Sequence, residues 1–141
     1  MSQENVELAY RAAEAFNRRD LDAFLALMDD DVEVISRIIV LEGGLRGHDG
    51  VRRWWQNWLD WLEPWATYRG TYEQLIDVGE HVVVLLRNHG RREDMETEVE
   101  LIGATIFTFR EGKLARWGDY AERAAAFEAV GLSEQDAHAD S

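Results

Sequence analysis

The sequence predicts an α+β domain in which helices cover one face of a curved antiparallel sheet. Before Pro64, apolar residues recur mostly at helical spacing, whereas from residue 67 to residue 122 they follow the alternation of strands. Helices and antiparallel strands that are segregated along the chain in this way are typical of the α+β class. A curved sheet that helices close on one side leaves a cavity at its open end, where we expect a ligand.

Three helices are predicted before Pro64. The first is indicated by apolar residues at helical spacing, which are Val6, Ala9, Tyr10, Ala13 and Phe16. Asp20 is a typical N-cap for a short second helix, which the run Asp29-Asp30-Asp31 is expected to end. The third helix spans about 49–63 and ends at Pro64, because proline cannot continue a helix.

One strand is predicted between the second and third helices, and four more follow the third. The expected strands are 32–36, 67–78, 81–91, 97–110 and 113–122. Glu111-Gly112 is the tight turn that joins the last two. A helical turn over 123–130 completes one domain over residues 1–132, and the polar segment 133–141 is expected to be a disordered tail.

Composition and charge exclude several classes of function. The chain of 141 residues has no cysteine, which excludes disulfides, thiol nucleophiles and cysteine-based metal sites. Its net charge of −13 disfavours binding to nucleic acids and to anionic membranes. It has no apolar run of about 18 residues that could span a bilayer, and its first residues do not resemble a signal peptide. We therefore expect a cytoplasmic protein that binds neither nucleic acid nor membranes.

Motifs for metals and cofactors are also missing. No two histidines have metal-ligand spacing, and the alternating carboxylates from Glu93 to Glu100 resemble the solvated face of a strand. The sequence has no phosphate-binding loop and no Gly-x-Gly-x-x-Gly after a strand. The chain is therefore expected to bind no metal and no cofactor.

Four local segments, in order and at the right spacing over about residues 3–132, resemble one family. They are Asn17-x-x-Asp20, Arg46-Gly47-His48-Asp49-Gly50-Val51, the hairpin from Phe107 to Leu114, and Arg116-Trp117-Gly118-Asp119-Tyr120 followed by Ala126 to Leu132. The chain thus resembles the SnoaL-like members of the NTF2-like superfamily. This resemblance implies a cone in which a curved sheet wraps around helices and encloses a pocket. Relatives include polyketide cyclases, ketosteroid isomerases and limonene-epoxide hydrolases.

The resemblance to ketosteroid isomerases leaves their catalytic positions empty. Those enzymes use an aspartate base together with a tyrosine and a protonated aspartic acid. Ser36 takes the position of the base, Ala12 takes that of the tyrosine, and the strand 99–109 contains no aspartate. Isomerase activity of this kind is therefore not expected.

The resemblance to limonene-epoxide hydrolases fills half of their site. Trp117-Gly118-Asp119-Tyr120 matches the family pattern of Trp, any residue, Asp and Tyr. Arg87-Asn88-His89 stands where the family has Arg, any residue and Asp, so His89 replaces the second aspartate. The pair that positions the water falls on Val34 and Ser36, and is therefore missing.

Polyketide cyclases of this family use an aspartate on the last strand as acid and base, and Asp119 resembles it. Proton removal next to a carbonyl needs a positioned base, a proton donor and an apolar cavity. The candidate catalytic residues are therefore Asp119, His89 as its proton partner, and Arg87 as an orienting group. Because Trp117 and Asp119 share one strand face, and Arg87 and His89 share another, all four could converge on the concave face. The alternative is that Asp119 and Arg87 form only a structural ion pair.

Aromatic residues supply the expected pocket walls. The candidates for binding a small apolar or polycyclic substrate are Tyr10, Phe16, Ser36, Trp54, Trp58 and Trp117. The third helix is apolar over so wide an arc that its outer side could contact a second subunit, and a homodimer is expected. Two functions remain open: a cofactor-independent acid/base enzyme, such as a cyclase, isomerase or epoxide hydrolase, or a noncatalytic module for ligand binding or dimerisation.

Overall fold

The computed structural model describes residues 2–35 and 45–132 and confirms the α+β class. Its helices are α1 (Ser2–Asn17), α2 (Leu21–Ala26), α3 (Gly47–Leu62) and α4 (Arg123–Ala129). Each lies within a few residues of its expected position. The backbone N–H of Ala23 donates to the Asp20 side chain over 3.1 Å, which confirms the predicted cap of α2. Ser36 and the tail 133–141 lie outside the described residues.

The strands form one six-stranded sheet in the order β2-β1-β6-β5-β4-β3. Their bounds are β1 (Met28–Ile35), β2 (Leu45–Arg46), β3 (Trp65–Val78), β4 (His81–Arg92), β5 (Val99–Arg110) and β6 (Lys113–Tyr120). The sheet is mixed, because β1 pairs with β6 in parallel while the other neighbours are antiparallel. The wholly antiparallel sheet that we expected is therefore corrected at this one pairing.

The first strand begins earlier than the sequence indicated. The run Asp29-Asp30-Asp31 was expected to end the second helix, but it lies inside β1. The pairing of β1 with β6 shifts register between Met28 and Glu33, and the short β2 pairs only with Glu33 and Val34. The three aspartates thus occupy an irregular stretch of the strand. This is why a strand accommodates three successive charges.

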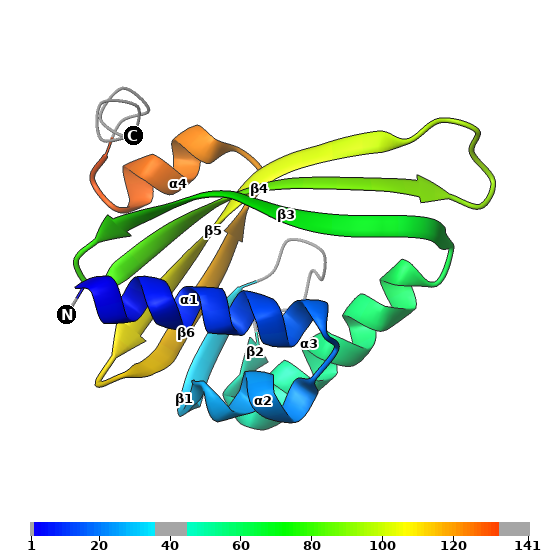
Figure 1. Ribbon diagram of the computed structural model, residues 1–141. Helices are drawn as coiled ribbons and strands as arrows, with labels where there is room; N and C mark the ends of the chain where they lie inside the picture. The colour runs from blue at the N-terminus through cyan, green and yellow to red at the C-terminus, as the bar shows by residue number, and fades with distance from the viewer. Residues whose placement is uncertain (1, 36–44, 133–141) are drawn as a thin grey trace.

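Helices cover both faces of the sheet (Figure 1). The helices α1, α2 and α3 lie on the concave face, and α4 lies across the opposite face. On β4 the side chains alternate accordingly: Val82 and Val84 belong to the core under α1 to α3, whereas Val83 and Leu85 pack with α4. The apolar residues of β4 therefore do not themselves reveal which face holds the pocket.

The hairpin between β5 and β6 has the predicted turn. Glu111 and Gly112 have φ values of 52° and 78°, as a two-residue turn with two left-handed residues requires. This turn sets the register that places Thr105 opposite Asp119 and Phe107 opposite Trp117. The last two strands thereby present one continuous inner face to the helices.

Candidate functional site

A cavity of about 260 Å³ lies between the concave face of the sheet and α1 to α3. Its walls are mostly apolar, and about half of the lining residues are aromatic. The aromatic residues that line it are Phe16, Phe24, Trp54, Trp58, Trp61, Tyr68, Tyr72, Phe107, Trp117 and Tyr120. Such a concave, mostly apolar cavity with a few polar groups is typical of a small-molecule site.

The tryptophans of α3 form one wall. The rings of Trp54 and Trp58, one helical turn apart, lie 6.2 Å between centroids and within 5° of parallel. Trp117 on β6 meets Trp54 edge to face, with centroids 4.3 Å apart. All three side chains are buried, and Phe16 of α1 contacts Trp58 with centroids 5.4 Å apart. The structure therefore places four of the expected substrate-binding residues at the pocket.

Tyr10 does not join them. It is 52% exposed and does not line the cavity. The buried side of α1 is formed by Ala9, Ala12 and Ala13, with Phe16 one turn further on. Tyr10 follows Ala9 by one residue, a rotation of about 100° on a helix of 3.6 residues per turn, which directs it away from the core. The expectation that Tyr10 lines the pocket is therefore corrected.

Asp119 is held in a defined orientation on the pocket wall. Its Oδ1 accepts a hydrogen bond of 2.9 Å from the Thr105 hydroxyl and one of 3.1 Å from the Trp117 indole N–H. Thr105 is itself 5% exposed and lies opposite Asp119 in the register of β5 and β6. Two donors on adjacent strands therefore fix a carboxylate inside an aromatic cavity.

Two tyrosines of β3 supply hydroxyl groups to the same pocket. Burial raises the pKa of Tyr68, and the charge of Asp119 raises it further, although a hydrogen bond from Asn88 opposes both. Burial and then the charge of Asp119 raise the pKa of Tyr72 far above its usual range. Both phenols are therefore neutral at physiological pH and can donate a hydrogen bond.

Asn88 brings an amide into the cavity from β4. Its Nδ2 donates to the Tyr68 hydroxyl over 2.9 Å. Its Oδ1 is buried and has no hydrogen-bond partner among the described residues, and the same holds for the indole nitrogens of Trp54 and Trp58. Buried polar atoms are seldom left unpaired in proteins, so these unpaired atoms are unusual features of the cavity lining.

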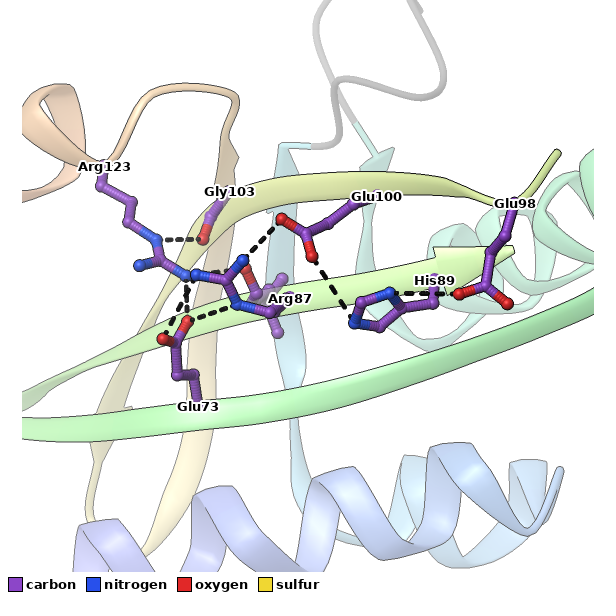
Figure 2. A network of polar contacts seen from close by, with 8 residues as sticks. Glu73, Arg87, His89, Glu98, Glu100, Gly103 and Arg123 are labelled. Atoms are coloured by element: carbon purple, nitrogen blue, oxygen red, sulfur yellow. Dashed lines mark hydrogen bonds and ion pairs between the residues drawn. The ribbon is translucent and has the colours of Figure 1, made fainter. Parts of the chain in front are cut away.

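Arg87 and His89 lie on the other face of the sheet (Figure 2). Arg87 pairs with Glu73 on β3 and Glu100 on β5, and His89 lies 3.5 Å from Glu98 and 3.8 Å from Glu100. Neither lines the cavity. The structure therefore does not bring them to Asp119, and both the expected convergence and the alternative ion pair of Arg87 with Asp119 are corrected.

The reason is the two-residue period of the strand. Arg87 and His89 share the side of Val83 and Leu85, which pack with α4, whereas Asn88 takes the opposite side. The outer network continues to Arg123 of α4, which donates to Glu73 over 2.6 Å. Arg123 and then Arg87 lower the pKa of Glu73 through their hydrogen bonds. This network joins β3, β4 and β5 to α4 on the outer face of the sheet, and it contributes no side chain of Arg87, Glu73 or Arg123 to the cavity.

Sequence reasoning missed several residues of the site, chiefly Tyr68, Tyr72, Asn88 and Thr105. Tyr68, Gly70 and Tyr72 alternate along β3, and this period of two was a usable signal for a shared face. Asn88 had none, because a neutral amide between Arg87 and His89 carries no sequence pattern typical of a catalytic group. Across residues 2–35 and 45–132, no group of three or more His, Asp or Glu side chains is placed to hold a metal ion. No helix in these ranges is long and apolar enough to cross a membrane.

A curved sheet that encloses a pocket against three helices defines the class of NTF2-like cone folds, and solved structures agree. An NTF2-like protein of unknown function from Burkholderia pseudomallei is 23% identical with a TM-score of 0.71, and the match covers 92% of this chain and 98% of that one. TerC, co-crystallised with polyporic acid, is 24% identical with a TM-score of 0.71 over 90% and 98% of the two chains. A putative polyketide cyclase from Xanthomonas campestris is 24% identical with a TM-score of 0.63 over 92% and 98%.

Within that class, the sequence itself identifies the family. The SnoaL-like domain matches residues 9–117, and the chain therefore belongs to the SnoaL-like family. No curated protein sequence matches the chain significantly. The resemblance noted in the sequence is thus confirmed for family and fold, while one fold of this kind hosts many activities.

Proposed function

We propose that this protein is a cofactor-independent acid/base enzyme that acts on a small apolar or polycyclic molecule, with Asp119 as the catalytic base. The observation that carries the proposal is the carboxylate of Asp119, which Thr105 and Trp117 hold on the wall of an aromatic cavity. A positioned carboxylate in a mostly apolar site is suited to proton transfer. TerC, which shares the fold, was crystallised with a small organic molecule, and this supports a similar use of the pocket here.

The chemistry begins at a carbon next to a carbonyl group. Asp119 removes a proton from this carbon, the electron pair of the broken C–H bond forms a C=C bond, and the π electron pair of the carbonyl group moves onto its oxygen. A neutral tyrosine hydroxyl from Tyr68 or Tyr72 stabilises the negative charge that develops there by donating a hydrogen bond. Return of the proton from Asp119 to another atom gives isomerisation. Attack of the enolate carbon on a second carbonyl carbon forms a C–C bond, and the oxygen of that carbonyl takes the proton back from Asp119, which gives cyclisation. Hydrolysis of an epoxide would instead use Asp119 to activate water.

Proton abstraction can be measured without knowing the natural substrate. 1-Tetralone is a bicyclic ketone whose α-protons exchange with D₂O, and NMR follows the loss of their signal. We expect the wild type to catalyse this exchange and Asp119→Asn to slow it by at least about 100-fold, the usual contribution of a general base. Asp77→Asn, an exposed aspartate on β3, is the matched control and should exchange as the wild type does. Equal rates in wild type and Asp119→Asn would contradict the proposal.

A noncatalytic binding module is the second candidate. It is favoured by the outward position of Arg87 and His89. Among the described residues that line the cavity, Asp119 is then the only acidic or basic side chain, and no second group of this kind lines the cavity to exchange protons with it. In that case the wild type binds 1-tetralone but does not accelerate exchange, and Trp58→Ala weakens binding while Asp119→Asn does not. Calorimetry and the exchange assay on the same three proteins separate the two candidates. A homodimer and a cytoplasmic location remain predictions.

A further inference from the structure

We propose that Asn88 and Tyr68 form a hydroxyl-recognition site inside the pocket, so that the ligand carries a hydroxyl group on a largely apolar skeleton. This inference rests on the proposed function only in taking the aromatic cavity as the ligand site. It adds the chemical class of the ligand and names the residues that select it.

The geometry of Asn88 is the first argument. The amide is anchored at one end, because Nδ2 donates to the Tyr68 hydroxyl over 2.9 Å. At the other end, Oδ1 is buried in a lining that includes Leu86 and Leu101, and it has no partner within the described part of the chain. A buried acceptor without a partner destabilises a protein unless a bound group supplies the hydrogen. A ligand hydroxyl supplies it.

Gly70 is the second argument, and it is independent of the first. Gly70 lies opposite Asn88 in the register of β3 and β4, and a Cβ atom there would lie 3.2 Å from Asn88 Oδ1. The backbone does not require glycine at this position, because Gly70 is not among the residues with positive φ. Glycine weakens a strand interior and often marks a close approach of another group. Glycine at this position avoids a close contact between a Cβ atom and the amide oxygen.

The pair offers one donor and one acceptor in either orientation of the amide. In the described orientation the Tyr68 hydroxyl accepts from Asn88 Nδ2 and has its own hydrogen left to donate to the ligand. Asn88 Oδ1 accepts a hydrogen bond from the ligand. If the amide rotates by 180°, Tyr68 donates to Oδ1, and the ligand then meets the Nδ2 donor and the oxygen of the tyrosine as acceptor. A hydroxyl group is both donor and acceptor, so it satisfies the site in both cases.

Two bicyclic probes of similar size test this selectivity. 2-Naphthol carries a hydroxyl group where 2-methylnaphthalene carries a methyl group, and calorimetry gives the Kd of each. We expect the preference of the wild type for 2-naphthol over 2-methylnaphthalene to fall by at least about tenfold in Asn88→Leu, because the variant loses the buried hydrogen-bond partner. Comparing this ratio between variants cancels the different hydration of the two probes.

Two further variants complete the experiment. Tyr68→Phe keeps the ring and removes the hydroxyl, so it should lower the same ratio, and it decides the question if circular dichroism shows that Asn88→Leu does not fold. His89→Gln is the matched control, because His89 is the next residue of β4 and lies on the outer face. Its ratio should equal that of the wild type.

The outcomes are distinguishable. If both probes bind the wild type and the ratio is unchanged in Asn88→Leu and Tyr68→Phe, the hydroxyl site is refuted while the pocket remains the ligand site. Equal weakening of both probes would show that Asn88 only supports the wall, and it refutes the site as well. If neither probe binds the wild type but the wild type catalyses the exchange of 1-tetralone, the hydroxyl site is refuted and the proposed function stands. If that exchange is absent as well, both fail.

Discussion

The hydrogen bond from Thr105 to Asp119 allows a quantitative test of the site. Thr105→Val keeps the branched shape of the side chain and replaces the hydroxyl by a methyl group. The donor is 5% exposed and lies 2.9 Å from the carboxylate oxygen, so the bond is shielded from water. Hydrogen bonds to charged groups contribute about 1.5–3 kcal/mol, and we expect Thr105→Val to lower the free energy of unfolding by that amount.

A double-mutant cycle isolates this pair from other effects of the substitution. The free energy of unfolding is measured by urea denaturation at pH 7 for the wild type, Thr105→Val, Asp119→Leu and the double variant. We expect a coupling energy of about 0.5–3 kcal/mol between the two positions, the range found for residues in contact. A coupling energy near zero, or a Thr105→Val variant as stable as the wild type, would refute the idea that Thr105 orients the carboxylate.

Two other predictions concern stability. Because burial raises the pKa of Tyr72 in the folded state, the unfolded chain loses this proton first above about pH 10, and stability falls as the pH rises further. Between pH 10 and 11.5, urea denaturation should show a fall that is steeper in the wild type than in Tyr72→Phe, by up to about 1.4 kcal/mol per pH unit, and equal slopes would contradict this. Gly90→Ala would place a Cβ atom 2.8 Å from the ring of Trp65 and 2.9 Å from the carbonyl oxygen of Thr67. It should destabilise the fold by about 1–3 kcal/mol in the same assay, and an unchanged midpoint would show that the ring moves aside freely.

The fold was predictable where local chemistry determines the backbone. Pro64 predicted the end of α3, Asp20 predicted the N-cap of α2, and Glu111-Gly112 predicted the turn of the last hairpin. The structure confirms all three. The parallel pairing of β1 with β6 was not predictable, because residues far apart in the chain determine it. The early start of β1 was missed because three successive aspartates do not resemble a strand.

The site was predictable only in part, for a related reason. Trp54, Trp58 and Trp117 were expected at the pocket, because large aromatic residues at helical or strand spacing indicate a buried face. The sequence does not indicate which residues of β4 face the cavity, because helices cover both sides of the sheet and the central residues of β4 are all apolar. Arg87 and His89 on the outer face therefore resembled catalytic residues, while the amide of Asn88 on the inner face did not.

The alternation of β4 separates two kinds of variation within one strand. Its outward residue Arg87 forms ion pairs with Glu73 and Glu100, and its outward residue His89 lies 3.5 Å from Glu98. Its inward residues Leu86 and Asn88 line the cavity. Substitutions at inward positions can therefore change the ligand preference of the cavity without disturbing the ion pairs on the outer face of the sheet. A library for altered ligand preference can be confined to every second residue of this strand, and the outer residues then serve as an unchanged frame.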